Sequence, residues 1–250
     1  MRRSFTCHWL GRVPYREAHA LQERVLAARL RGEVGDTVLL LEHDPVITLG
    51  RGADEGHILL PVEARPYAGI DVVETGRGGD VTYHGPGQLV AYPIVDLRPD
   101  RCDVRRYVQD LAAVMVGLAA RHGVGAKSLQ GDAKLIGVWV DLDAPGAFPE
   151  GPVEGRRIGK IGAIGVRLSR WVTMHGFAFN GATDLSHFDL IVPCGITQYG
   201  VTSLKELRGE APAVQQLAEA SVPLFGEVFD ADVRLALAEE TEALRRGGAR

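Results

Sequence analysis

The sequence predicts a mixed α/β domain in which helices pack against a sheet. Segments typical of buried strands alternate unevenly with amphipathic helical segments, and the chain contains no internal repeat. Its 250 residues with 46% hydrophobic composition are sufficient for one large domain with a substantial core. We therefore expect a principal domain over residues 1–210 and a helical C-terminal extension over 211–250, packed on the same domain.

In the first hundred residues, the run 37–42 (TVLLLE) is too apolar for a strand with one wet face. We expect it at the centre of the sheet. The pattern predicts a helix over 14–31, with Pro14 in a first turn that tolerates it. Pro93 indicates that the last strand of this region is an edge strand or contains a bulge. Further strands are expected at 5–10, 46–49, 70–74 and 88–97.

In the second half, residues 103–121 give the clearest helical pattern, with Asp103 as the N-cap and an apolar stripe at helical spacing. The Pro- and Gly-rich stretch 143–155 reads as a surface hairpin extension or lid. Strands are expected at 134–142, 156–168 and 171–180, and two C-terminal helices at 211–219 and 230–244, separated around Pro223 and Gly226.

Composition excludes several classes of function. With 28 Lys+Arg against 32 Asp+Glu the net charge is -4, so no global basic field argues for a nucleic-acid partner. The start of the sequence shows no apolar secretion signal and no run long enough to span a bilayer, so we expect a cytoplasmic protein without a membrane partner. The cysteines Cys7, Cys102 and Cys194 are too widely spaced for a zinc site of the CxxC kind, and His175 is expected to be a hydrogen-bonded core histidine, so no metal site is predicted.

Residues 77–88, RGGDVTYHGPGQ, concentrate polar chemistry among glycines. Glycines on both sides of the short extended run 81–83 allow backbone conformations that bring the main chain close to a ligand. Arg77, Asp80 and His84 contribute a cation, a carboxylate and an imidazole to this segment. The alternative is a tight hairpin whose glycines serve only the turn.

A thiol and a lysine are the other candidates for chemistry. Cys194 lies between Pro193 and Gly195, small and rigid neighbours that suit a cysteine presented to a substrate. Lys160 lies among apolar neighbours, which would disfavour its ammonium form and lower its pKa, unless it is a strand lysine facing water. An ammonium near Cys194 would favour the thiolate, but only the fold can bring these two residues together. The sequence contains no dinucleotide, P-loop, zincin, serine-hydrolase or dithiol motif.

Three segments, in this order, carry a resemblance to a known family: RGGDVTYHGPGQLVAYP at 77–93, GKIGAIGVRLSRWVTMHGFAFN at 159–180 and IVPCGI at 191–196. They closely resemble the octanoyltransferases of lipoate biosynthesis. Residues 39–51 and the helix that follows Pro14 also match. The resemblance implies the fold shared by lipoate and biotin protein ligases, and it makes 1–210 an acyltransferase catalytic domain.

The resemblance also implies roles for individual residues. Cys194 would be the acyl-thioester nucleophile, and Lys160 its pKa-lowering partner and acid/base. We expect the acyl chain over the backbone of Gly162 and Gly165, and His84 either to orient the carbonyl with Thr82 or to brace the glycine loop. The implied substrate-contacting residues are Arg77, Gly78, Gly79, Asp80, Val81, Thr82, Tyr83, His84, Ala163, Ile164, Gly165, Gly176, Phe177 and Ala178, of which Phe177 is bulkier than the leucine common in the family.

The implied activity is transfer of an octanoyl or lipoyl group from acyl carrier protein to a lysine of lipoyl domains, without ATP or a metal. The expected partners are octanoyl acyl carrier protein, the lipoyl domains of 2-oxoacid dehydrogenases and the glycine cleavage H protein, bound by a monomer. The carrier protein and the acceptor domains should be acidic, so we expect a basic rim formed by Arg51, Arg156 and Arg157. The alternatives are an ATP-dependent lipoate or biotin ligase, a cysteine hydrolase, and a non-catalytic acyl-carrier-binding module.

Overall fold

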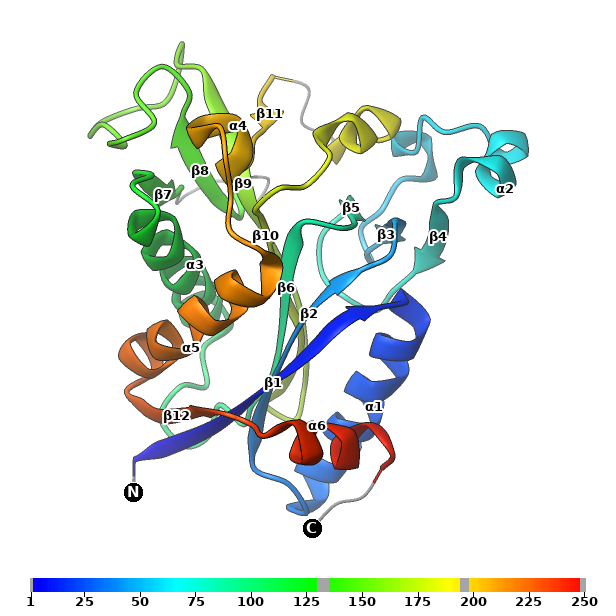
Figure 1. The fold of residues 1–250 in the computed structure, drawn as a ribbon, viewed down its shortest axis with the longest axis vertical. Coiled ribbons are helices and arrows are strands. Elements are labelled where there is room, and N and C mark those ends of the chain that lie inside the picture. The colour runs from blue at the N-terminus through cyan, green and yellow to red at the C-terminus, as the bar shows by residue number, and fades with distance from the viewer. Residues whose placement is uncertain (1, 130–134, 194–197, 248–250) are drawn as a thin grey trace.

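A mixed nine-stranded sheet forms the centre of the molecule (Figure 1). The structure is a computed structural model that describes residues 2–129, 135–193 and 198–247. The strand order is β12-β1-β2-β6-β10-β9-β8-β7, and β11 pairs in parallel with β9. The strands of this sheet are β1 (Arg3–Val13), β2 (Asp36–His43), β6 (Gln88–Ile94), β7 (Ala126–Ser128), β8 (Val138–Asp141), β9 (Ile158–Ser169), β10 (Val172–Asn180), β11 (Gly200–Val201) and β12 (Ala231–Leu235).

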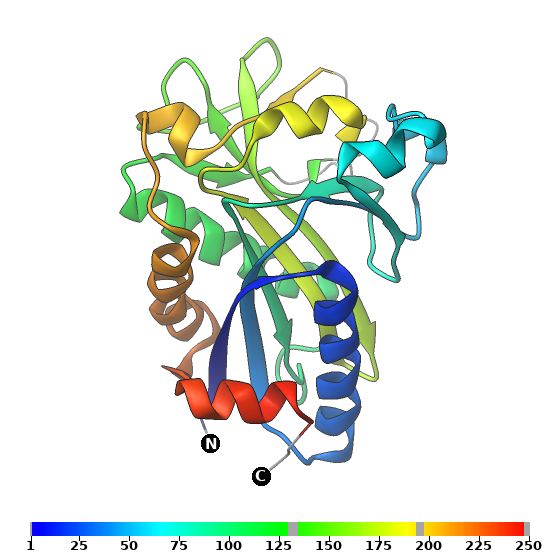
Figure 2. The same ribbon diagram turned by 45° about the vertical axis from the view of Figure 1, so that its right-hand side comes forward.

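Helices cover both faces of this sheet. Figure 2 shows α1 (Tyr15–Arg31) along one face and α3 (Val104–Arg121) with α5 (Val214–Phe229) along the other. Successive side chains of a strand point to opposite faces, so in β2 Leu39 packs on the α1 side and Leu40 on the α3 and α5 side. Both side chains are fully buried. None of the helices in the described part of the chain is long and apolar enough to cross a membrane.

A second, three-stranded sheet lies beside the upper end of the large one, in the order β4-β3-β5 (Figure 1). It has its own apolar cluster, which includes Ile47, Tyr83 and Phe188. The cluster packs β3 and β5 of the small sheet against the turn Leu185–Leu190. The elements of this region are β3 (Val46–Leu49), β4 (Asp71–Glu74), β5 (Val81–His84), the short helix α2 (Arg65–Ala68) and the 3-10 turns Glu55–His57, Val62–Ala64 and Leu185–Leu190.

Several sequence predictions are confirmed. The run at 37–42 is the buried β2, enclosed between β1 and β6. The helix at 14–31 is α1, and Asp103 caps α3 by accepting hydrogen bonds from the amides of Arg105 and Arg106 at 2.8 and 3.1 Å. The stretch at 143–155 is the loop that joins the antiparallel strands β8 and β9.

Pro93 does not mark an edge strand, because β6 lies between β2 and β10 in the middle of the sheet. The alternative prediction, a bulge, is also wrong, because the register of Ala91 with Phe177 is kept at the bridge of Asp96 with Val172. The regular pairing of β6 with β10 stops at Ala91 and Phe177, and beyond it the Thr173 hydroxyl donates to the carbonyl of Pro93 at 2.7 Å. Proline has no N–H to donate to this ladder, and its carbonyl is satisfied by a side-chain hydroxyl instead of a backbone amide.

We expected a wholly helical C-terminal extension, and this prediction is wrong. Helix α5 continues through Pro223 and Gly226, and residues 231–235 form β12, which pairs in parallel with β1. An interior proline costs a helix about 3 kcal/mol, whereas burying one large apolar side chain gains about 1.5–3 kcal/mol. Helix α5 buries Leu217, Leu224 and Phe225, so packing outweighs the cost of the proline. The remaining helices are α4 (Leu204–Arg208) and α6 (Ala238–Arg245).

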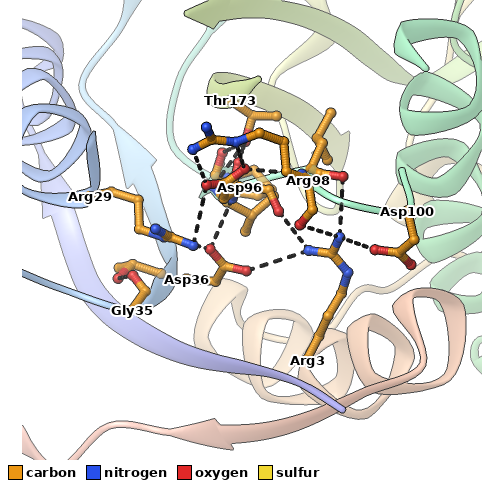
Figure 3. Close-up of polar contacts among 12 residues, drawn as sticks. Arg3, Arg29, Gly35, Asp36, Asp96, Arg98, Asp100 and Thr173 are labelled. Atoms are coloured by element: carbon orange, nitrogen blue, oxygen red, sulfur yellow. Dashed lines mark hydrogen bonds and ion pairs between the residues drawn. The ribbon is translucent and has the colours of Figure 1, made fainter. Parts of the chain in front are cut away.

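A network of arginines and aspartates joins α1, the strands β1 and β2 and the segment that follows β6 (Figure 3). The buried carboxylate of Asp36, at the start of β2, lies 2.8 Å from Arg29 Nε and 3.7 Å from Arg3 NH1. It also accepts a hydrogen bond of 2.9 Å from the amide of Asp96, whose own carboxylate lies 2.7 Å from Arg98 NH2. The network ties the start of β2 to the segment that follows β6.

Candidate active site

A narrow pocket opens where β5, β9 and β10 meet. Its free volume is about 50 Å³, room for one or two water molecules at about 30 Å³ each. The lining side chains therefore leave little free space in the pocket. The residues that line it are Tyr15, Arg77, Gly79, Asp80, Val81, Thr82, His84, Tyr92, Ile136, Lys160, Ala163, Ile164, Gly165, His175, Gly176, Phe177 and Ala178.

The pocket unites the three segments that the sequence predicted as substrate-contacting. Parts of 77–84, all of 163–165 and all of 176–178 line it, together with Lys160. Two predicted residues do not. Gly78 is not part of the lining, and the buried Tyr83 side chain packs on His187 and Phe188 in the cluster of the small sheet. Cys194 lies outside the described residues.

Lys160 is buried, with 7% of its surface exposed, so it is not a strand lysine that faces water. Its Nζ donates to the carbonyl of Ile136 at 3.3 Å and lies 4.7 Å from the centre of the Trp139 ring. A carbonyl oxygen and the face of an aromatic ring both favour a positive charge. The side chain can therefore hold an ammonium at the wall of the pocket.

The glycine-rich segment 77–80 is held by backbone hydrogen bonds on two sides. The amide of Gly50 donates to the carbonyl of Asp80 at 3.1 Å, and the amide of Gly78 donates to the carbonyl of Val166 in β9 at 2.9 Å. A methyl group on Gly50 would lie 2.2 Å from the carbonyl oxygen of Gly79, closer than a non-bonded carbon and oxygen can approach. Glycine at position 50 is what lets the two backbones meet.

Arg77 braces this segment with its side chain. The guanidinium donates to the carbonyl and hydroxyl of Thr48 at 2.6 and 2.9 Å, and to the carbonyl of Gly78 at 3.1 Å. Its stem lies beside Gly165, where an added methyl would be 3.0 Å from Arg77 Cδ.

The expected acyl groove over Gly162 is wrong. A methyl group on Gly162 would lie 2.5 Å from the Met115 sulfur, so α3 already fills the space that this glycine leaves. The apolar part of the pocket wall comes instead from side chains such as Val81, Ile136 and Ile164. The bulky ring of Phe177 is directed toward α5, where it stacks on Phe225 at 6.1 Å between ring centres.

A chain of hydrogen bonds fixes the protonation of His84. The carbonyls of Thr202 and Tyr83 accept from the side-chain amides of Asn180 and Gln88, at 2.9 and 3.2 Å. Gln88 therefore turns its oxygen toward His84, whose Nδ1 lies 2.7 Å away and must carry the proton. Burial, then the neighbouring His43, lowers the pKa of His84 to about 3. The neutral ring has no proton on Nε2, so it cannot orient a carbonyl as a donor; the alternative role, as a brace of the glycine loop, fits the contacts.

Four further polar residues of the site were not singled out for it from the sequence: Tyr15, His43, Tyr92 and His175. His43 is fully buried, bonded through Nδ1 to the carbonyl of Val13 at 2.7 Å and through Nε2 to the Tyr92 hydroxyl at 2.8 Å. Burial lowers the pKa of His43 to about 4 and raises that of Tyr15 to about 12. His43 and Tyr15 are therefore uncharged at neutral pH, while Arg77, which lines the same pocket, is a charge that further lowers the pKa of His84.

His175 differs from its prediction as a hydrogen-bonded core histidine. It is buried, but its Nε2 has no hydrogen-bond partner among the described residues, and it lines the pocket. Its backbone adopts φ 60° and its amide donates to Gln22 Oε1 at 3.0 Å. The positive φ lies next to Gly176, where the ladder of β6 and β10 is interrupted.

The two cysteines that the structure describes are not part of this pocket. Cys7 is fully buried in β1, and burial raises its pKa to about 12, so it stays a thiol at neutral pH. Cys102 is exposed just before α3 and its thiol faces the carbonyl of Leu97 at 3.8 Å, beside the arginine and aspartate network.

Comparison with known proteins gives the family. The sequence profile of the lipoyl protein ligase A/B catalytic domain matches residues 14–226. The chain is 46% identical over 229 residues to an octanoyltransferase of Myxococcus xanthus, covering 92% of this chain and 60% of that relative. It is 45% identical over 234 residues to an octanoyltransferase of Chloroflexus aurantiacus, covering 93% of this chain and 97% of that protein. The chain belongs to the octanoyltransferase family.

Solved structures agree with the fold that this family predicts. Lipoate-protein ligase A bound with ATP superposes with a TM-score of 0.70 at 17% identity, covering 98% of this chain and 93% of the other. Biotin protein ligase from Aquifex aeolicus gives a TM-score of 0.51 at 15% identity, covering 90% and 70%. The predicted fold of lipoate and biotin protein ligases is confirmed. In a member of the octanoyltransferase family, the pocket at Lys160 is therefore the candidate active site.

Proposed function

We propose that this protein transfers an octanoyl group from acyl carrier protein to a lysine of lipoyl domains, through a thioester on Cys194. One observation carries the proposal: a buried lysine, Lys160, shares a narrow pocket with residues of all three segments that the resemblance to octanoyltransferases implies as substrate-contacting. Those segments come from three different strands and loops, so their meeting is a property of the fold. Of the remaining cysteines, Cys7 is buried away from the pocket and Cys102 lies outside it.

The first half-reaction forms the acyl-enzyme. The Cys194 thiolate attacks the thioester carbonyl, a new carbon–sulfur bond forms, and the bond to the phosphopantetheine sulfur breaks. The ammonium of Lys160 supplies the proton that the departing thiol needs. The contacts of Lys160 with Trp139 and the Ile136 carbonyl favour this charged starting form.

The second half-reaction forms the amide. The neutral amine of the lipoyl-domain lysine attacks the Cys194 thioester, the carbon–sulfur bond breaks, and the thiolate is restored. Lys160, now neutral, accepts the proton that the attacking nitrogen releases. The enzyme thus returns to its starting thiolate and ammonium.

The proposed reaction needs neither ATP nor a metal, because a thioester exchanged for another thioester changes little in free energy and the final amide is stable. An ATP-dependent ligase would instead activate a free acid. An eight-carbon chain exceeds the free volume of about 50 Å³, so we expect side chains at the pocket mouth to move when it binds. Ile136, which lines the pocket and is 40% exposed, is placed to do so.

The proposed partners are octanoyl acyl carrier protein, the lipoyl domains of 2-oxoacid dehydrogenases and the glycine cleavage H protein, each bound by a monomer. The expected basic rim is weaker than its residue types suggest. Arg156 and Arg157 pair with Asp141 and Asp143 of the β8–β9 hairpin at 3.5 and 2.8 Å. Arg51, by contrast, is exposed beside the glycine-rich segment.

Intact-mass analysis tests the proposal. The protein mixed with octanoyl acyl carrier protein, without ATP, should gain one octanoyl group that hydroxylamine removes and that Cys194→Ala does not form. Adding a lipoyl domain should then move the octanoyl group to that domain. Release of free octanoate without an acceptor would identify a hydrolase, dependence on ATP and free acid a ligase, and carrier binding without any adduct a non-catalytic module.

A further inference from the structure

Two short segments pair beside the part of the chain that leads to Cys194. The amide of Leu59 donates to the carbonyl of Leu190 at 2.8 Å, and the amide of Val192 donates to the carbonyl of His57 at 2.7 Å. Between these bonds, Ile58 and Ile191 form an antiparallel bridge. Val192 precedes Cys194 by two residues, a separation that the chain spans with at most about 7 Å.

The side chain of His57 attaches this pairing to the pocket wall. Its Nδ1 lies 2.6 Å from Oδ2 of Asp80, a short hydrogen bond. The other oxygen of Asp80 accepts the amide of Asp54 at 3.2 Å, and Asp54 in turn caps the 3-10 turn Glu55–His57 through the amide of Gly56 at 2.8 Å. Asp80 therefore holds both ends of this turn.

Asp80 is itself fixed. Its carbonyl accepts the amide of Gly50 at 3.1 Å, and its carboxylate is only 14% exposed at the edge of the pocket. A continuous set of contacts thus runs from the glycine-rich segment through His57 to the amide of Val192. His57 is the link whose side chain bonds one end and whose carbonyl bonds the other.

We propose that His57 is a positioning residue, which transmits the fixed position of Asp80 to the segment that carries Cys194. This inference rests on the proposed function, because it concerns the placement of that nucleophile. His57 is not part of the pocket lining; it acts through the backbone of Val192. A misplacement of about 1 Å in a reacting group can lower the rate about 10²-fold, so a loosened segment should slow acylation without unfolding the protein.

The test compares three variants of the full chain. His57→Ala removes the bond to Asp80, whereas His57→Asn retains a nitrogen donor close to the position of Nδ1. Glu55→Gln changes an exposed side chain of the same turn and serves as the matched control. Asp80 is left intact because it lines the pocket.

Two measurements are made on each variant: the single-turnover rate of octanoyl-enzyme formation, and amide hydrogen exchange at Leu59 and Val192. We expect His57→Ala to slow acylation at least tenfold and to speed exchange at both amides, while exchange in β2 stays unchanged. His57→Asn should recover most of the rate, and Glu55→Gln should match the wild type. Alkylation of Cys194 by iodoacetamide, a small reagent that needs no alignment, should change less than threefold.

Unchanged exchange at Leu59 and Val192 in His57→Ala would overturn the inference, whether or not the protein transfers octanoyl groups. Wild-type acylation in His57→Ala, with loosened amides, would also overturn it. An inactive wild-type protein would instead count against the proposed function, and the exchange measurement would still decide whether His57 holds the segment. Loss of protection throughout the sheet would assign His57 to general stability and reject a positioning role.

Discussion

The Nδ1 atom of His84 donates its proton to Oε1 of Gln88 across 2.7 Å, which leaves Nε2 as the unprotonated nitrogen of a ring that lines the pocket. Gln88 has no freedom to turn over, since its amide nitrogen bonds the Tyr83 carbonyl and Asn180. The ring is therefore an acceptor. Any group of a substrate that binds His84 must bring its own hydrogen.

Nitrogen NMR can test this protonation state. At pH 7 the His84 ring should show a protonated Nδ1 and an unprotonated Nε2, and it should remain neutral down to about pH 4, because burial lowers its pKa to about 3. Gln88→Glu adds a negative charge at Nδ1 and should raise that pKa. A ring protonated on Nε2 in the wild type would contradict the assignment.

Lys160→Met should abolish most of the activity and leave the fold intact. Methionine has a similar length but loses the cation–π contact with Trp139 and cannot supply or accept a proton, and positioned acid–base groups contribute about 10²–10⁴-fold. Single-turnover acylation followed by mass spectrometry measures the loss, and the melting temperature checks the fold. Lys127→Met, on the exposed side of β7, is the control and should acylate normally. Normal acylation in Lys160→Met would remove this lysine from the mechanism.

Gly50→Ala should damage the site through the backbone. The added methyl group would lie 2.2 Å from the Gly79 carbonyl oxygen and 2.8 Å from Arg77 NH1, so the glycine-rich segment must move. We expect at least a tenfold loss of acylation and a lower melting temperature. Gly146→Ala makes the same change where nothing lies within 4 Å, and both properties should match the wild type. Equal behaviour of the two variants would mean that the close approach at Gly50 is unimportant.

The arginine and aspartate network should matter for stability and not for chemistry. Asp36→Asn removes a buried charge that faces both Arg29 and Arg3, and breaking such a pair costs about 3 kcal/mol. Urea unfolding should report this loss, while acylation at a permissive temperature stays normal, because neither Asp36 nor its arginine partners line the pocket. Glu33→Gln, in an exposed pair with Arg31, should leave the urea midpoint unchanged.

Acid should destabilise the protein before its carboxylates are protonated. Burial lowers the pKa of His43 to about 4, whereas an unfolded histidine titrates near 6.5. Between these values the unfolded chain binds more protons, so the free energy of unfolding falls as pH drops from about 6.5 to about 4, on the order of a few kcal/mol. Urea midpoints measured from pH 7 to pH 4.5 check this. A midpoint that stays constant down to pH 5 would contradict the buried, neutral state of His43.

The fold was predictable where hydrophobic periodicity is strong. The apolar run at 37–42 and the apolar stripe of α3 show directly which residues are buried. The sequence therefore predicted β2 and α3 with almost their observed bounds. Pro223 misled the prediction because local chemistry ends helices at proline, while the burial of Leu217 and Phe225 that keeps α5 intact is tertiary. Strand β12 has little pattern of its own and is defined by its partner β1.

The residues of the site also fall into those that the sequence could predict and those that only the fold brings together. Motifs that need glycine or a rare residue type, such as 77–84 and Lys160, were visible in the sequence, and Lys160 and most of 77–84 line the pocket. Tyr15, His43 and Tyr92 come from α1, β2 and β6, and only the fold brings these ordinary residues together. The link from Asp80 to His57 is equally invisible, since nothing in the spacing of the two residues indicates a bond.

The pairing of β1 with β12 has a consequence for how the protein is made. β1 leaves the ribosome long before β12, with most of the chain still to be synthesised between them. During that interval one side of β1 presents unsatisfied amides and carbonyls, which can recruit a strand from another nascent chain. A chain truncated before β12 would expose this edge of β1 permanently. Such a chain would aggregate even though it retains every catalytic residue.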